Sequence, residues 1–195
     1  MTSISKFKVS LLISAVLLFI TSGASADQII EIDRLVKSLN DQVKGSDARM
    51  RIIANVADDG KPDDWREFKS DEDRSRLDNG TNLNDNFSIV QNETGTWLDT
   101  MYQSPSRDWA QYVTYYFRLD GTLAKMETEL RTFFGEMIAI RNRWFAPMGS
   151  ELKIEREYND LSTGKPAEPG DDFYDIKEPV YLRLDQLPVY KMIKN

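Results

Sequence analysis

The sequence of 195 residues contains no cysteine and no histidine. The absence of cysteine excludes disulfides, a thiolate nucleophile, a lipoprotein anchor and cysteine-ligated zinc or iron–sulfur centres. The absence of histidine excludes the catalytic arrangements that depend on imidazole, and the usual zinc sites. We therefore assign no catalytic residue from the sequence and expect no cofactor and no bound metal ion.

The chain also contains fewer basic than acidic residues. The chain carries 25 Lys and Arg against 32 Asp and Glu, which gives a formal net charge of −7. A protein that binds nucleic acid neutralises phosphates with a basic surface. An acidic chain is a poor candidate for that role, so we expect no nucleic-acid partner.

The N-terminus has the three parts of a secretory signal peptide. Lys6 and Lys8 form a short basic region, residues 9–20 are almost entirely apolar, and Ala24-Ser25-Ala26 fits the small-residue cleavage rule. The pattern predicts a signal peptide at 1–26. An uncleaved N-terminal anchor is the alternative interpretation.

Export without disulfides favours a bacterial envelope protein. The apolar run of 12 residues is shorter than the roughly 20 residues that a membrane span requires. We therefore expect no membrane span after signal cleavage.

Removal of 26 residues, which include two Lys and no acidic residue, leaves 169 residues with a net charge of −9. A chain of that length buries enough surface to fold without disulfides, which favours the bacterial periplasm or an extracellular location.

Residues 27–195 are predicted to form a single α+β domain. Its first part, residues 27–45, reads as an amphipathic helix that Asp27 caps and Gly45 ends. Apolar side chains recur there at helical spacing: Ile29, Ile32, Val36, Leu39 and Val43. Residues 46–111 read as irregular loops and short strands, with 87–90 and 96–101 as candidate strands. Residues 49–56 read as a first strand or as a second helical piece.

Residues 112–195 read as an antiparallel β-meander. Strands are predicted at 112–118, 122–132, 136–145 and 151–158, separated by short turns that contain glycine. Successive strands joined by such turns are typical of a meander. Residues 179–187 are read as a last strand or an edge segment.

Charged and apolar residues alternate along these strands, and one register satisfies both sets. A three-residue turn at 134–136 would produce it. The expected cross-strand pairs are Glu129–Arg141, Glu127–Arg143, Leu130–Ile140 and Met126–Trp144. One face of the sheet would then be a solvated ladder of acidic and basic side chains, and the N-terminal helix would cover the other, apolar face.

Two stretches, 115–123 and 143–152, share an aromatic strand end, a turn with glycine and a leucine that opens the next strand. The second carries one extra residue in this comparison. The unit resembles the hairpin of YD-type and MORN-like repeat proteins. The whole chain resembles the uncharacterised exported β-meander proteins of bacteria, a resemblance that implies no settled activity.

The charged face is the candidate binding surface, with Arg141 and Arg143 at its centre. The residues predicted to bind are Arg141, Arg143, Glu127, Glu129 and Glu155. We expect such a face to recognise an envelope protein or a small ligand, in a protein that is monomeric or weakly oligomeric. The sequence leaves the partner and the oligomeric state open.

A carboxylate-dependent hydrolase acting on cell-envelope glycans is the alternative. Glycoside hydrolysis needs only two carboxyl groups about 5–10 Å apart, and Glu127 with Glu129, or Glu155 with Glu157, would share a face. A glutamate paired with arginine stays ionised and makes a poor general acid. Binding is therefore favoured over catalysis, and a structural envelope protein is a third interpretation.

Two polar loops contain several potential oxygen ligands for calcium. They are the stretches 58–64 and 78–85, both rich in Asp or Asn. Neither has the spacing of an EF-hand. The sequence therefore favours solvated loops over a calcium site.

Overall fold

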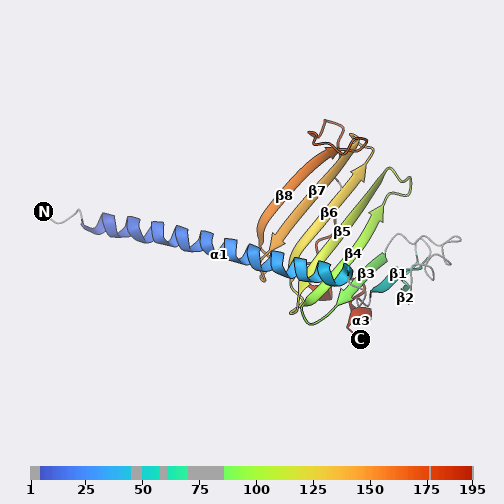
Figure 1. Ribbon diagram of the computed structural model, residues 1–195, viewed down its shortest axis with the longest axis horizontal. Coiled ribbons are helices and arrows are strands. Elements are labelled where there is room, and N and C mark those ends of the chain that lie inside the picture. Colours follow the sequence, from blue (N-terminus) through green and yellow to red (C-terminus); the bar gives the residue numbers. More distant parts are fainter. Residues whose placement is uncertain (1–4, 45–49, 58–60, 70–85, 176, 195) are drawn as a thin grey trace.

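The computed structural model describes residues 5–44, 50–57, 61–69, 86–175 and 177–194, with the side chains of the first helix described from residue 25 onward. It contains one long helix and a single eight-stranded antiparallel sheet (Figure 1). The predicted α+β class is confirmed.

Helix α1 (Ser5–Lys44) lies across the sheet with its second half and extends away from it with its first half (Figure 1). Ile32, Val36 and Leu39 are buried against the sheet, as the helical spacing predicts. The predicted end at residue 44 is confirmed, but the helix runs back to Ser5, so Asp27 is an interior residue and no cap. Among the residues described, no helix is long and apolar enough to cross a membrane.

The sheet is a meander, except that the first two strands of the chain exchange places at one edge. Its strands are β1 (Arg51–Asn55), β2 (Trp65–Phe68), β3 (Asn86–Gln91), β4 (Gly95–Gln103), β5 (Trp109–Arg118), β6 (Leu123–Thr132), β7 (Met137–Phe145) and β8 (Glu151–Asp160). Their order is β2-β1-β3-β4-β5-β6-β7-β8. The stretch 46–111 therefore contributes half of the strands. Three of these match the predicted strands, and β2 was not predicted.

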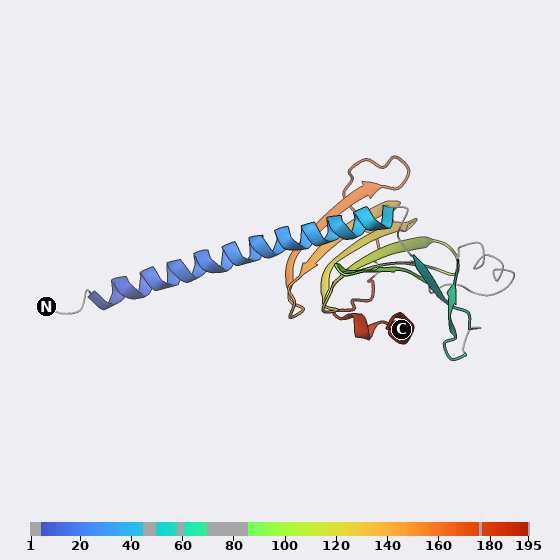
Figure 2. The same cartoon turned by 60° about the horizontal axis from the view of Figure 1, so that its bottom comes forward.

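Each face of the sheet is packed against another element over part of its area, whereas one fully solvated face was predicted. On one face, α1 packs on Tyr116, Ala124 and Trp144. On the other, the C-terminal strap, residues 179–194, packs on the larger apolar core (Figure 2). We call these the helix face and the strap face.

The described part of the strap contains no strand, so the interpretation of 179–187 as a last strand is wrong. The alternative of an edge segment holds in part, because Arg183 forms an isolated antiparallel β-bridge with Thr122. It contains a 3₁₀ turn η1 (Leu184–Gln186) and the short helix α3 (Tyr190–Ile193). Leu187, Val189 and Ile193 are buried in the strap-face core. These residues contribute their side chains to the core. Two backbone hydrogen bonds also join the strap to the sheet: Leu123 N donates to Leu182 O at 2.9 Å, and Leu184 N donates to Gly121 O at 2.8 Å.

The predicted register of β6 and β7 is wrong by one residue. The observed pairs are Glu129–Ile140, Thr128–Arg141, Glu127–Asn142 and Met126–Arg143. Thr132 pairs with Met137, so the turn has four residues, 133–136, instead of three. Gly135 and Glu136 have φ of 70° and 49°, a left-handed conformation that Glu rarely adopts. A shift of one residue moves every side chain to the other face.

The two hairpins that resemble each other in sequence also share their turn geometry. The matching backbone hydrogen bonds are Arg118 N to Thr122 O and Gly121 N to Arg118 O in one, and Ala146 N to Ser150 O and Gly149 N to Ala146 O in the other. A β-bulge follows each turn, at Ala124 and at Leu152. The expected extra residue in the second unit is wrong, because Leu152 corresponds to Ala124 instead of Leu123.

Candidate functional site

The structure separates the five predicted binding residues. Because of the shifted register, Arg141 and Arg143 lie on the strap face. Glu127, Glu129 and Glu155 lie on the helix face. The predicted ladder that alternates these glutamates with the two arginines does not form.

On the helix face, each of these glutamates pairs with a cation two residues away on its own strand. Glu127 accepts hydrogen bonds from Lys125 Nζ at 2.7 Å and from the Tyr116 hydroxyl at 2.9 Å. The other two ion pairs are Arg131–Glu129 at 2.6 Å and Lys153–Glu155 at 2.5 Å. These two pairs are exposed and contribute little to stability, whereas Lys125 of the first pair is buried.

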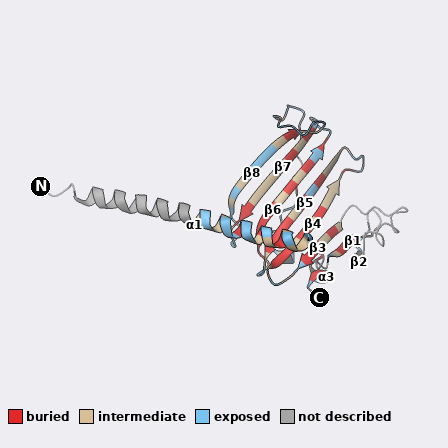
Figure 3. Ribbon diagram, in the orientation of Figure 1, coloured by how far each residue is buried: buried red, intermediate tan, exposed pale blue. Residues whose placement is uncertain are grey.

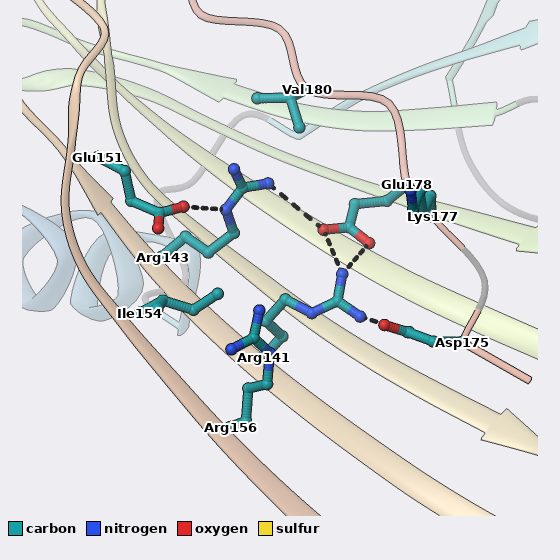
Figure 4. Close-up of a pocket in the computed structure, with 9 residues that line it drawn as sticks. All are labelled: Arg141, Arg143, Glu151, Ile154, Arg156, Asp175, Lys177, Glu178 and Val180. Atoms are coloured by element: carbon teal, nitrogen blue, oxygen red, sulfur yellow. Dashed lines mark hydrogen bonds and ion pairs between the residues drawn. The ribbon is translucent and has the colours of Figure 1, made fainter. Parts of the chain in front are cut away.

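On the strap face, Arg141 is bound by two carboxylates. Its Nη1 donates to both carboxylate oxygens of Glu178, at 2.9 and 3.1 Å, and its Nη2 donates to Asp175 at 2.5 Å (Figure 4). The Glu178 side chain is only 1% exposed and that of Arg141 13%. This buried pair joins β7 to the chain just before the strap.

Arg143 lies beside Arg141, and carboxylates neutralise its charge only in part. Its Nε donates to Glu151 at 2.6 Å, and its Nη1 is 3.7 Å from a Glu178 oxygen, beyond hydrogen-bond distance. Its guanidinium lies over the Phe145 ring at 5.1 Å. The remaining Nη2 group donates to no described residue.

Arg156 has no hydrogen bond or ion pair with any residue in the described part of the chain. It lies directly opposite Arg141 in the β7–β8 pairing, and like charges in that position are destabilising. Arg141 is neutralised by two carboxylates, whereas Arg156 is exposed. Arg156 belongs to the edge strand β8, which is exposed along part of its length (Figure 3). Lys177, also exposed, likewise has no partner among the described residues.

These residues line a cavity of about 410 Å³, which we call the arginine pocket (Figure 4). It is formed by Arg141, Arg143, Arg156, Lys177, Glu151, Asp175, Glu178, Ile154 and Val180. Four cationic and three acidic side chains give a local net charge of +1 in a protein with a net charge of −7. The pocket is therefore a positive site on an acidic molecule.

The chemistry of the pocket suits binding better than hydrolysis. Glu151, Asp175 and Glu178 each accept a hydrogen bond from an arginine. The acidic side chains of the pocket are therefore occupied by the protein's own arginines. The available donors, in contrast, are guanidinium and ammonium groups, which bind carboxylate and phosphate oxygens.

Sequence reasoning missed five charged residues of the pocket: Glu151, Arg156, Asp175, Lys177 and Glu178. Arg156 lies within a predicted strand, and pairing that strand with its neighbour would have placed it opposite Arg141. No local pattern marks Glu178, whose contact with Arg141 spans 37 residues of sequence.

The helix face contains one carboxyl group that burial perturbs. Asp99 on β4 is half-buried and accepts a hydrogen bond from the Thr114 hydroxyl at 2.8 Å. Burial raises the pKa of Asp99, and the bond from Thr114 opposes this only in part. The folded state therefore binds a proton more tightly than the unfolded chain does, and ionised Asp99 destabilises the fold.

The variant Asp99→Asn is expected to be more stable than the wild type at pH 7, because it removes that penalty and keeps an oxygen to accept from Thr114. The free-energy penalty of ionised Asp99 develops as pH rises from the ordinary aspartate pKa through the raised pKa. The difference in stability between the variant and the wild type should therefore vanish near pH 3. Urea denaturation at the two pH values measures it. Asp41→Asn, at an exposed helix position, is the control, and a less stable Asp99→Asn at pH 7 would contradict the assignment.

The two loops considered for calcium are only partly described. Asp58, Asp59 and the stretch 78–85 lie outside the described residues. Asp63 and Asp64 accept hydrogen bonds from Asn55 at 2.8 Å and from Arg66 at 2.5 Å. Both carboxylates are thus engaged with neighbouring side chains.

The chain was compared with protein-family models, curated proteins and solved structures, and no match was found in any of the three. Function is therefore inferred from the geometry of the site.

Proposed function

We propose that this protein is a binding protein whose arginine pocket holds an anionic group, a carboxylate or a phosphate, of a ligand or partner. The observation that carries the proposal is the arrangement of Arg141 and Arg156. They face each other across β7 and β8, yet the protein's own carboxylates neutralise only one of them. An anion between Arg156 and Arg143 would remove the remaining repulsion.

Three further properties support this proposal. The pocket is of the size of a small-molecule site, about 300–1,000 Å³. Ion pairs with Glu178 and Glu151 fix the orientation of Arg141 and Arg143, so little side-chain entropy is lost when a ligand binds. Arg156 and Lys177 supply the charge that is available for the ligand.

Calorimetric titration with inorganic phosphate and with acetate tests the proposal. We expect saturable binding of at least one of these anions, and a loss of about tenfold or more in affinity for Arg156→Gln. The matched control is Arg131→Gln, an exposed arginine on the helix face, which should leave binding unchanged. Equal affinity in both variants, or no binding by the wild type, would overturn the proposal.

We also propose that the protein is exported and that residues 1–26 are removed. The signal-peptide pattern motivates this proposal. The described side chains of α1 in the helix-face core begin at Ile29, so cleavage after Ala26 would leave that core intact.

Expression in a bacterium, followed by fractionation and intact-mass measurement, tests the export proposal. The expected product is an envelope or secreted protein that begins at Asp27. The variant Ala26→Leu, which breaks the small-residue rule, should accumulate unprocessed. A wild-type chain that keeps residues 1–26 would contradict the proposal.

A further inference from the structure

A second cavity, of about 310 Å³, lies between α1 and the turns at one end of the sheet. We call it the helix-end cavity. Arg118, the last residue of β5, and Glu31 of α1 both line it. It shares no lining residue with the arginine pocket.

Arg118 is a half-buried cation held by neutral groups. Its Nη1 donates to the Leu123 carbonyl at 2.7 Å and its Nη2 to the Phe145 carbonyl at 2.6 Å. Its Nε donates to no described residue, and it forms no ion pair within the described part of the chain. Burial lowers the pKa of Arg118, and the more distant charges of Asp120 and Glu31 offset this only in part.

Glu31 presents the opposite charge to the same cavity. Its side chain is exposed on α1 and makes no hydrogen bond or ion pair with a described residue. The two side chains therefore line one cavity with opposite charges but do not contact each other. A ligand that carries an anion and a cation a short distance apart would complement both.

The rest of the wall contains apolar and neutral groups. Ile32 and Leu35 line it from the helix, Pro147 from the β7–β8 turn and Thr94 from the β3–β4 turn. Apolar surface with a few fixed polar groups is the usual composition of a small-molecule site. The apolar part would accommodate an aliphatic side chain.

We propose that the helix-end cavity binds a small zwitterion of the amino-acid type with an aliphatic side chain. The ligand carboxylate lies against the Arg118 guanidinium, its ammonium group lies against Glu31, and its side chain packs on Ile32, Leu35 and Pro147. Bound in this way, it joins α1 to the sheet. The proposal does not depend on the arginine pocket.

Calorimetric titration of the purified protein with L-leucine tests this site. We expect saturable binding of leucine, and little or none of leucinamide, which lacks the carboxylate, or of 4-methylpentanoate, which lacks the ammonium group. No binding of leucine, or equal binding of 4-methylpentanoate, would overturn the proposal.

Variants separate this site from the arginine pocket. Glu31→Gln, a change at an exposed position, should weaken leucine binding about tenfold, and Arg118→Lys should weaken it at least as much. Asp41→Asn on the same helix, and Arg156→Gln in the arginine pocket, should have no effect. Because Arg118→Lys also removes bonds to two carbonyls, Glu31→Gln decides the outcome, and unchanged affinity in that variant would overturn the proposal.

Discussion

Replacing Glu178 with alanine is expected to destabilise the protein by about 3 kcal/mol or more, the cost of removing one partner from a buried ion pair. The Glu178 side chain is 1% exposed and accepts two hydrogen bonds from Arg141, whose own side chain is 13% exposed. Without it, Arg141 keeps only Asp175, and Arg143 keeps only Glu151. The strap also loses the contact that fixes its start to β7.

Urea denaturation measures this effect. The control is Glu155→Ala, which removes an exposed ion pair with Lys153 and should cost less than 1 kcal/mol. Acetate should restore part of the stability of Glu178→Ala, because it can occupy the position of the lost carboxylate and binds only the folded state. Equal stability of the two variants would show that the buried pair does not hold the strap.

The variant Gly95→Ala is expected to destabilise the protein by about 2–3 kcal/mol, the upper part of the range for overpacking. Gly95 begins β4, is buried and pairs with Arg118. A Cβ atom there would lie 2.3 Å from the carbonyl oxygen of Phe117. Because that oxygen belongs to the backbone of β5, it can move only if the strand pairing is distorted.

Thermal or urea unfolding checks this prediction, with Gly170→Ala as the matched control. A Cβ at residue 170 lies 3.1 Å from Asp172 Oδ1, the end of a flexible side chain that can turn aside. The control should change stability by no more than about 0.5 kcal/mol. Equal effects of the two substitutions would contradict the close packing of β4 on β5.

The sequence predicts the elements that local patterns specify. The stripe of α1 that includes Ile32, Val36 and Leu39 is buried as its spacing requires. The four strands from β5 to β8 and the turns between them also lie close to the predicted positions. Each of these follows from helical spacing, alternation or turn residues within a few positions.

Local sequence patterns do not specify the register of the strands or the contacts between distant parts of the chain. The β6–β7 turn has four residues because Glu136 adopts a positive φ, a conformation that no sequence pattern there indicates. The bulges at Ala124 and Leu152 interrupt the alternation only in the neighbouring strand pairs, and the β6–β7 pairing itself is regular. The extra turn residue alone therefore shifts the β6–β7 register. As a result, Arg141 and Arg143 were expected beside Glu127 and Glu129, on the wrong face.

The candidate site was therefore predicted only in part. Arg141 and Arg143 line the arginine pocket, but the two acidic partners of Arg141 come from a loop 34 and 37 residues further along the chain. Their contact depends on how the chain returns across the strap face after β8. That path is set by the burial of Leu187, Val189 and Ile193, which no local charge pattern reveals.

The most direct test of the proposed function is an NMR titration of the arginine Nε–Hε signals with inorganic phosphate or acetate, with Arg143 and Arg156 assigned by Arg→Lys variants. Binding of the anion between these two side chains predicts that both signals shift together and saturate, while the signal of Arg131 on the helix face does not move. Shifts of similar size at all exposed arginines, or no shift at Arg156, would contradict an anion site in the arginine pocket.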